Sequence, residues 1–139
     1  MGWTISKSLQ EQMIENCVKE FPLEACGIFL GPINESFTPT GEILEIWPAS
    51  NIEKSARIYS VDPQDIFNAT KYANEKQLEI VGIYHSHTHS QAYPSPTDIE
   101  KSVDKNWCYT IVSLAEDEVI ANYFQIINSE VKKIDIELL

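Results

Sequence analysis

The chain has 139 residues, of which 43% are hydrophobic and 22% are charged, and its formal net charge is −11. This length and composition are typical of one globular domain that is long enough to bury a sizeable core. The 10 Lys and Arg residues form no basic cluster among 21 Asp and Glu residues, so we expect neither nucleic acid nor an anionic membrane as a partner.

The sequence also carries information about compartment. No stretch reaches the ~18 consecutive apolar residues of a membrane span, and the opening MGWTISKSLQ lacks the apolar core of a signal peptide. Cys17, Cys26 and Cys108 share no C-x-x-C spacing, which argues against a disulfide framework and against a Cys-type structural zinc site. We therefore expect a cytoplasmic protein in which residues 1–139 form a single domain.

The first half of the chain predicts one helix followed by strands. Apolar residues recur three to four apart over residues 6–20, as on one face of a helix that Ser6 can cap. Short apolar or β-branched runs predict strands at 25–30, 42–48 and 57–60. The turn-rich stretch 33–41 separates the first two strands and is expected to be a mobile loop.

The second half predicts two helices and the remaining strands. Asp62-Pro63 begins a helix over 63–75 whose inner face carries Ile66, Ala69, Thr70 and Ala73. A central strand begins at Ile80, a short helix follows Asp98 to about residue 103, and strands are expected at 107–114, 119–127 and 131–136, the last two as a hairpin. This order predicts an α/β fold of the α+β type, a mixed sheet flanked by helices.

The most informative stretch is 80–98, IVGIYHSHTHSQAYPSPTD. Its apolar start has no helical spacing and predicts a buried strand. Side chains at i and i+2 of a strand project to the same side with their Cα atoms roughly 6.5–7 Å apart, so His85 and His87 can turn toward one point. The end of this strand is therefore a candidate two-nitrogen platform for a metal.

A catalytic zinc takes three protein ligands and leaves a fourth position for water, so a third ligand is needed from another element. Asp98 is the candidate, because Ser95-Pro96 has the composition of a helix start that leads back to the strand end. Taken alone, Ser95-x-x-Asp98 is better explained as a capping box that only starts a helix. The conjunction of His85, His87, Ser95 and Asp98 at fixed spacing is what indicates a metal site.

Three further residues have more than one interpretation. Glu24 stands directly before the strand at 25–30, where an acid cannot move far from the core, and it is a candidate general base or an ordinary surface residue. His89 forms a second His-x-His pair with His87, but no acid falls at the matching distance, so we expect a loop residue near the substrate or in solvent. Cys26 is either a small buried hydrophobe or a residue that approaches the metal.

The pattern Glu24, His85-Ser86-His87, seven residues, Ser95, two residues, Asp98 resembles the signature of JAMM (MPN+) zinc metallopeptidases, E…H-[ST]-H-x7-S-x2-D. EACG, YHSHT and AYPS-x-TD are most similar to the prokaryotic Mec branch of that family, and Thr88 stands where deubiquitinases usually have proline. The resemblance covers essentially the whole chain. It implies a JAMM/MPN-like fold, related to that of cytidine deaminases, in which a β-sheet is flanked by helices.

The resemblance also implies a mechanism. One Zn²⁺ per chain, held by His85, His87 and Asp98, would lower the pKa of a bound water from about 15.7 to about 7 and polarise the scissile carbonyl. Glu24 would move the water proton to the departing amine, and Ser95 would donate a hydrogen bond to the oxyanion. Sequence alone does not show which groups orient the ligand histidines.

The implied substrate is the C-terminal Gly-Gly tail of a ubiquitin-like sulfur-carrier protein joined to cysteine, with release of free cysteine. The alternatives are an isopeptidase that removes ubiquitin-like modifiers from lysine and, in another class, a non-catalytic scaffold of the same fold. Intact Glu24, His85, His87 and Asp98 argue against the scaffold. The carrier protein and the oligomeric state stay open.

Overall fold

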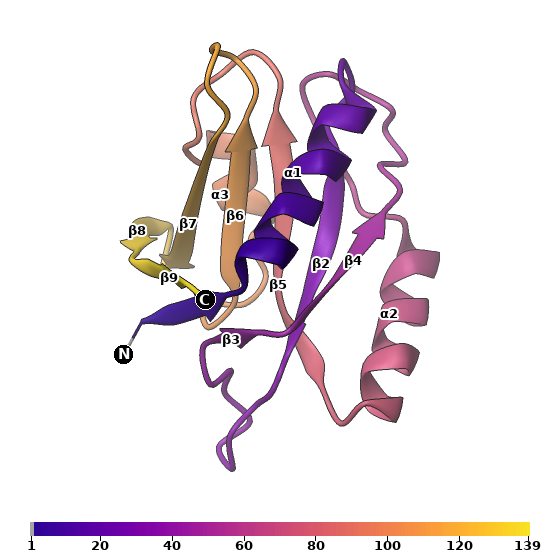
Figure 1. The fold of residues 1–139 in the computed structure, drawn as a ribbon, viewed down its shortest axis with the longest axis vertical. Helices are drawn as coiled ribbons and strands as arrows, with labels where there is room; N and C mark the ends of the chain where they lie inside the picture. The colour runs from indigo at the N-terminus through magenta and orange to yellow at the C-terminus, as the bar shows by residue number, and fades with distance from the viewer. Residues whose placement is uncertain (1) are drawn as a thin grey trace.

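The computed structural model describes residues 2–139, in which a six-stranded sheet forms the centre of the molecule (Figure 1). The strand order is β4-β2-β5-β6-β7-β8, and every neighbouring pair is antiparallel except β5 and β6. The strands are β4 (Glu45–Ala49), β2 (Cys26–Gly31), β5 (Glu79–His87), β6 (Cys108–Ser113), β7 (Ile120–Ile127) and β8 (Glu130–Ile134). The expected mixed sheet is therefore confirmed, with β5 inside it.

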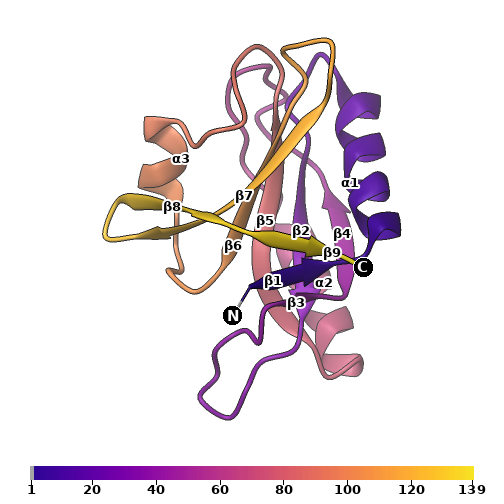
Figure 2. The ribbon, with the colours of Figure 1, turned by 60° about the vertical axis from the view of Figure 1, so that its left-hand side comes forward.

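A smaller parallel sheet joins the two ends of the chain (Figure 2). Its order is β3-β1-β9, with bounds β3 (Glu42–Ile43), β1 (Trp3–Ile5) and β9 (Ile136–Leu138). The backbone N–H of Leu139 donates to the carbonyl of Ile5 at 2.9 Å, so the final residues are bonded to the first strand. Strands β1 and β9 were not predicted as separate elements, because each has only three residues and too short a pattern to recognise.

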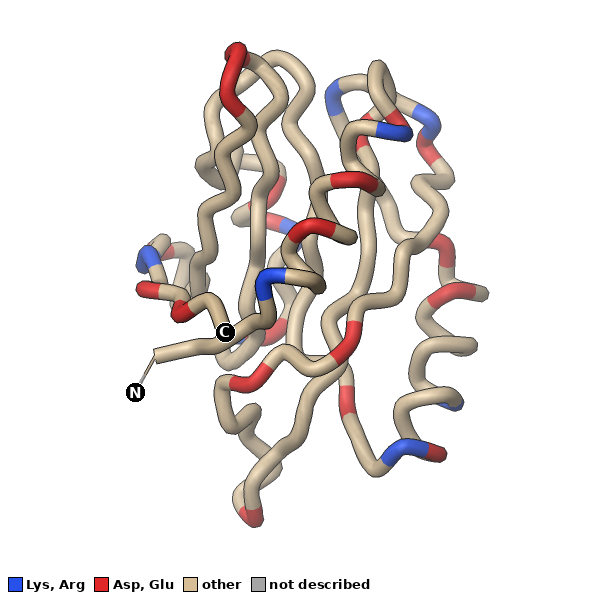
Figure 3. The backbone as a smooth tube through the Cα atoms, viewed as in Figure 1, with Lys and Arg blue, Asp and Glu red and all other residues tan. Residues whose placement is uncertain are grey.

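Acidic residues lie along the whole length of the molecule, and basic residues are few (Figure 3). None of the helices in residues 2–139 is long and apolar enough to cross a membrane.

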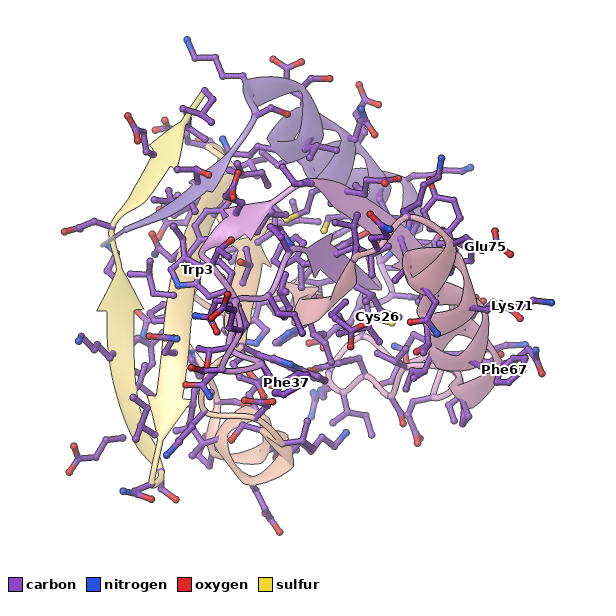
Figure 4. The ribbon with its side chains drawn as sticks, turned by 90° about the horizontal axis from the view of Figure 1, so that it is seen from below. Trp3, Cys26, Phe37, Phe67, Lys71 and Glu75 are labelled. Carbon is purple, nitrogen blue, oxygen red and sulfur yellow. The ribbon has the colours of Figure 1, made fainter. Side chains whose placement is uncertain are left out.

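The two long helices cover opposite faces of the six-stranded sheet. Helix α1 (Lys7–Glu20) buries Met13 and Cys17 in one apolar cluster with Phe29, and helix α2 (Pro63–Glu75) buries Ala69 and Ala73 against Ile28 and Leu30. Because successive side chains of a strand point to opposite faces, Phe29 and its neighbours divide the core into two layers. Figure 4 shows Cys26 in the interior, while Lys71 and Glu75 point outward from α2.

A bulge in β5 sets which residues face each layer. Leu30 pairs with Ile80 and Phe29 with Gly82, so Val81 is an extra residue on β5. Beyond the bulge, Tyr84 points to the α1 layer and lies over Gly27, where an added Cβ would come within 2.1 Å of the tyrosine ring. Position 27 therefore has no room for a side chain larger than that of glycine. Because side chains alternate along a strand, the two histidines that flank Ser86 point to the opposite, α2 layer.

Several predicted elements are confirmed and others are wrong. The helices at 6–20 and 63–75, the strands at 25–30 and 107–114 and the hairpin of β7 and β8 are present within one or two residues at most ends. The predicted strand at 42–48 is two strands in different sheets, and the short helix α3 (Pro96–Lys101) ends before residue 103. On α2 the inner face is narrower than predicted, since Ile66 and Thr70 are exposed.

The predicted strand at 57–60 is wrong. These residues have no regular secondary structure, and only an isolated bridge joins Asn51 to Val61. Their backbone groups bond to side chains and to other loops instead of to a neighbouring strand, which a local pattern of residue types does not show.

Candidate metal centre

The two histidines of the central motif lie at the end of β5 and point to the same face. Strand β5 is fixed on both sides, because His85 lies opposite Cys26 of β2 and Ile111 of β6. His85 and His87 are 3% and 5% exposed, and their Nε2 atoms are 3.2 Å apart. The structure thus brings together the two nitrogens that the strand spacing predicted.

Asp98 reaches the same point from the first turn of α3. Its Oδ2 atom lies 3.1 Å from Nε2 of His87 and 3.2 Å from Nε2 of His85. The same oxygen accepts a hydrogen bond of 2.8 Å from the backbone N–H of Ser95, the N-cap of the helix. The helix start therefore holds the carboxylate beside the histidines.

The three atoms have the spacing of ligands around one ion. A tetrahedral centre with bonds of about 2.0–2.1 Å keeps its ligand atoms about 3.3 Å apart, close to the separations of 3.1–3.2 Å here. Within residues 2–139, these side chains form the group of His, Cys, Asp or Glu residues whose ligand atoms all lie within 4.8 Å of one another. Two imidazole nitrogens and one carboxylate oxygen suit a divalent transition metal such as zinc.

Hydrogen bonding orients the ring of His87. Its Nδ1 lies 2.8 Å from the carbonyl oxygen of Gln91, which can only accept, so Nδ1 carries a proton and Nε2 presents its lone pair in the neutral ring. Burial lowers the pKa of His87, but the bonds to Asp98 and Gln91 outweigh it and raise that pKa above its ordinary value. A metal at Nε2 of His87 therefore competes with a proton for the same lone pair.

The other two members of the cluster have lowered pKa values. Burial lowers the pKa of His85, although Asp98 opposes this. Burial would raise the pKa of Asp98, but the hydrogen bonds from His85, His87 and the Ser95 backbone hold it well below its usual range. A neutral imidazole and an ionised carboxylate are the forms in which these groups bind metals.

Glu24 lies beside this cluster, two residues before β2. Its side chain is 5% exposed, and its pKa is raised to about 7 by burial, with the charges of His87 and Asp98 acting in opposite directions. The backbone of Glu24 is held on both sides, because its N–H donates to Ser55 at 2.8 Å and its carbonyl accepts from Asn51 at 3.1 Å. A carboxyl group with a pKa near neutrality can accept and release a proton.

Ser86, the residue between the two histidines, ties Glu24 to them. Its hydroxyl oxygen accepts from the N–H of Ala25 at 2.8 Å, and its own N–H donates to the Ala25 carbonyl at 3.0 Å. Because Ser86 is completely buried, these bonds fix the chain next to Glu24 against the strand that carries the histidines.

Ser95 fits both interpretations that the sequence left open. Its Oγ atom accepts from the N–H of Asp98 at 3.1 Å, and its N–H donates to the carboxylate of Asp98, which together make a capping box. That bond uses the oxygen of the Ser95 hydroxyl as an acceptor and leaves its proton to donate elsewhere.

His89 and Cys26 lie outside the candidate metal-binding group of His85, His87 and Asp98. His89 is exposed, its Nδ1 lies 2.8 Å from the hydroxyl of Thr88, and its ring centroid is 6.4 Å from that of Phe21. Cys26 is completely buried, and burial raises the pKa of its thiol to about 12, so the thiol stays protonated. Cys26 therefore has the properties of a small buried hydrophobe.

Four groups around the centre were not predicted from the sequence. They are the carbonyl of Gln91, the side chain of Asn51, the ring of Tyr59 and the ammonium of Lys101. A backbone acceptor has no residue-type signal at all, and the other three depend on contacts between distant parts of the chain. Among these four groups, only Lys101 has a position in the sequence that pointed to the site, because it follows Asp98 by three residues on α3.

A buried glutamate beside a His-His-Asp group at the end of a central strand is the arrangement of a metallohydrolase centre. The chain matches the family described as prokaryotic homologs of the JAB domain over residues 6–125. The protein belongs to this family and is a hydrolase of the JAB type. The resemblance to prokaryotic JAMM proteins is thereby confirmed, and the family is typically metal-dependent.

Relatives with named activities support this assignment. The CysO-cysteine peptidase of Mycobacterium tuberculosis is 32% identical over 109 residues, which are 78% of this chain and 71% of that protein. A desampylase of Haloferax volcanii is 30% identical and covers 71% of this chain and 68% of its own length. A probable TtuB-protein conjugate cleaving protease of Thermus thermophilus is 28% identical and covers 84% and 72%.

Solved structures are similar over nearly the whole chain. The solution structure of a Desulfitobacterium hafniense protein matches with a TM-score of 0.85 at 27% identity and covers 98% of this chain and 92% of that one. A Salinibacter ruber protein matches with a TM-score of 0.72, also at 27% identity, over 99% and 91%. The fold is therefore shared with these proteins.

Proposed function

We propose that the protein is a zinc-dependent hydrolase that cleaves the amide bond at the C-terminus of a ubiquitin-like protein, and that it releases cysteine from a sulfur-carrier adduct in cysteine biosynthesis. The observation that carries this proposal is the triangle of two Nε2 atoms and one Oδ2 atom, 3.1–3.2 Å apart, beside the buried Glu24. One zinc ion per chain, held by His85, His87 and Asp98, would activate water and polarise the scissile carbonyl.

Glu24 acts as the general base in this proposal. It takes a proton from the attacking water and passes it to the nitrogen of the leaving amine as the C–N bond breaks, so that each product leaves in a stable form. A pKa of about 7 suits both transfers, because the group gains and loses a proton with similar ease at neutral pH. The backbone of Glu24 bonds to Asn51 and Ser55, and the next residue, Ala25, bonds to Ser86. These hydrogen bonds keep the Glu24 carboxyl close to the cluster.

Ser95 donates its hydroxyl proton to the oxygen of the carbonyl as negative charge develops there. Such a donor typically contributes about 3–4 kcal/mol to the lowering of the barrier. The capping bond from Asp98 supports this role, because it fixes the position of Oγ without using the hydroxyl proton.

An apolar groove next to the cluster supports an extended tail as the substrate. A cavity of about 360 Å³ lies between α2 and α3, and its lining includes Tyr59, Ile83, Lys101 and Trp107. A second cavity of about 300 Å³ shares Trp107 with it and extends to the loop that carries Phe37. In this proposal the two cavities form the groove that takes up the Gly-Gly tail.

The names of the relatives support the same bond type. A CysO-cysteine peptidase acts between a named protein and cysteine, and a TtuB-protein conjugate cleaving protease acts on a protein conjugate. We extend this to a ubiquitin-like partner of the present chain. The match over residues 6–125 supports one catalytic domain at residues 1–139, and three free buried cysteines support a cytoplasmic setting.

The second candidate is an isopeptidase that releases a ubiquitin-like modifier from lysine. The similarity to desampylases favours it, and the two reactions use the same site residues and differ only in the leaving amine. The scaffold hypothesis has no support from the site, since the candidate base and all three candidate ligands are present and adjacent.

One experiment separates these candidates. The purified protein is assayed for zinc and then incubated with a sulfur carrier ending in Gly-Gly-Cys, and in parallel with the same carrier linked to a lysine side chain. Release of cysteine alone is the expected result, and preferential release from lysine would replace the proposal with the isopeptidase. Bound zinc with neither cleavage would contradict both substrates, and a Glu24→Gln sample controls for contaminating proteases.

A further inference from the structure

The irregular segment 51–60 connects the three parts of the chain that carry the site. Three of its carbonyl groups accept hydrogen bonds: one from a site residue, one from the residue that follows a site residue, and one from a residue on the same helix as a site residue. These bonds are Glu24 N to Ser55 O at 2.8 Å, Thr88 Oγ1 to Ala56 O at 2.9 Å and Lys101 Nζ to Tyr59 O at 2.6 Å. The segment is therefore hydrogen-bonded to all three parts of the chain that surround the cluster.

Tyr59 is the residue of this segment that touches the cluster directly. Its ring stacks on the imidazole of His85, with ring centroids 4.2 Å apart and an interplanar angle of 20°. Both side chains are buried, at 8% and 3% exposure, so the stack is shielded from water. Tyr59 also lines the apolar cavity, which makes its ring the wall between that cavity and His85.

The two histidines are oriented by different means. The ring of His87 is fixed by the bond from Nδ1 to Gln91, whereas the polar contacts found for His85 among residues 2–139 join its Nε2 atom to His87 and Asp98. Metal-binding histidines usually have such an acceptor, which sets the direction of the ring. Outside the cluster itself, the flat contact with Tyr59 is the feature that restricts rotation of the His85 ring.

Lys101 holds Tyr59 in this position. Its Nζ atom bonds to the Tyr59 carbonyl and lies 5.4 Å from the centroid of the tyrosine ring, within the range of a cation–π contact. Lys101 follows Asp98 by three residues, so one short helix presents both the candidate ligand and the residue that holds Tyr59.

We infer that Tyr59 is a positioning residue for the metal: its ring, held by Lys101, keeps the His85 imidazole in the orientation in which Nε2 faces the ion. The inference rests on the proposed function, since it requires that His85, His87 and Asp98 bind the metal. Tyr59 also lines the proposed substrate groove, but its proposed effect on the metal passes through His85.

The test measures zinc affinity by competition with a chelator, together with the absorption spectrum of the cobalt-loaded protein, and neither measurement depends on turnover. Tyr59→Leu removes the flat ring and is expected to weaken zinc binding by about 10–100-fold and to change the cobalt spectrum. Tyr59→Phe keeps the ring and is expected to bind zinc within about threefold of the original protein.

Tyr123→Leu is the matched control, because Tyr123 is also a buried tyrosine, and its hydroxyl donates to Gln10 on the α1 side of the sheet. It is expected to lower thermal stability and leave zinc affinity unchanged. An equal loss of zinc affinity in this variant would overturn the inference, because the effect would then follow from stability alone. Unchanged affinity in folded Tyr59→Leu would also overturn it.

Lys101→Met tests the inference without touching the core, because Lys101 is exposed and methionine keeps most of its stem. A smaller loss of about 3–10-fold is expected, with recovery in Lys101→Arg, and this pair decides the matter if Tyr59→Leu does not fold. Unchanged affinity in Lys101→Met would then count against the inference. Failure of the original protein to bind zinc would overturn the proposed function itself, which is a separate result.

Discussion

Strand β5 and the irregular segment 51–60 both surround the candidate metal centre, but they reach their positions by different physical means. Strand β5 is held by regular backbone pairing to β2 and β6, and its alternation alone puts His85 and His87 on one face. Segment 51–60 has no such pairing and is fixed by separate bonds to distant residues. The two candidate histidine ligands thus lie on the regular element, and Tyr59, which stacks on His85, lies on the irregular one.

This difference has a physical basis. A central strand has many equivalent backbone bonds, so losing one side chain leaves its course unchanged. An irregular segment depends on a few bonds, and each one removed frees a large part of it. Substitutions in β5 should therefore change metal binding and hydrolysis more than the free energy of unfolding. Substitutions in segment 51–60 should change all three.

The largest effect is expected for His87→Ala on β5. Removing one of three protein ligands should abolish stoichiometric zinc binding and reduce hydrolysis to background, while the fold remains, because β5 stays paired on both sides. Metal content by mass spectrometry and circular dichroism check these two outcomes. Full zinc content in this variant would show that the ligand set is different.

The next largest effect is expected for Glu24→Gln. Glu24 lies between the two regions, because its backbone bonds to segment 51–60 and its neighbour Ala25 bonds to Ser86 of β5. Glutamine keeps the shape and the backbone bonds to Asn51 and Ser55 but cannot accept the proton, so turnover should fall by about 10²–10⁴-fold with zinc retained. Steady-state kinetics and metal analysis on one sample provide the measurement. Undiminished turnover would remove Glu24 from the mechanism.

Asn51→Ala is the corresponding test of segment 51–60. The Asn51 side chain donates to the carbonyls of Glu24 and Ile58 and accepts from the N–H groups of Glu53 and Ser60, at 3.0–3.1 Å. Its loss should lower the free energy of unfolding by about 1–3 kcal/mol, measured by urea denaturation.

Asn34→Ala is the control for this change. Asn34 makes two side-chain bonds, to the N–H groups of Ser36 and Thr38, but only within the exposed loop at 33–41. A smaller loss of stability is expected there. An equal loss in the two variants would contradict the special role of segment 51–60.

A fourth prediction concerns pH and the metal-free protein. Burial raises the pKa of Glu24 from 4.5 to about 7, so between these values the folded state binds more protons at this site than the unfolded state does. The contribution of Glu24 to stability is therefore present below pH 4.5 and is lost as the pH rises through about 7.

Glutamine does not titrate, so the stability of Glu24→Gln relative to the original protein should increase as the pH rises over this window. Thermal unfolding of both proteins with a chelator present measures the difference. A difference that is constant with pH would show that Glu24 does not titrate with a raised pKa.

The smallest effect is expected for His89→Ala. His89 is exposed and lies outside the metal-binding group, so zinc content should not change. Loss of metal in this variant would mean that the histidine register inferred from β5 is wrong.

The sequence contains the information for those parts of the site that depend on local periodicity. The alternation around Ser86 predicted the platform of His85 and His87, and Ser95-Pro96 predicted the helix that brings in Asp98, because strand and helix starts have signatures a few residues long. The fold class followed from the same elements in order.

The remainder depends on contacts that join distant positions. The sequence IYS at 58–60 has the composition of a strand, yet Tyr59 stacks on His85 and bonds through its carbonyl to Lys101, 42 residues away in sequence. The orientation of His87 depends on a backbone carbonyl at Gln91, which any residue type would supply. Neither contact leaves a pattern in residue types.

The most direct test of the account is the position of the metal itself. Crystals grown with zinc and measured on both sides of the zinc absorption edge should show one anomalous peak about 2.0–2.1 Å from His85 Nε2, His87 Nε2 and Asp98 Oδ2. This position would confirm His85, His87 and Asp98 as the ligands of one ion. A zinc-loaded protein whose peak lies elsewhere, for example at His89, would contradict it.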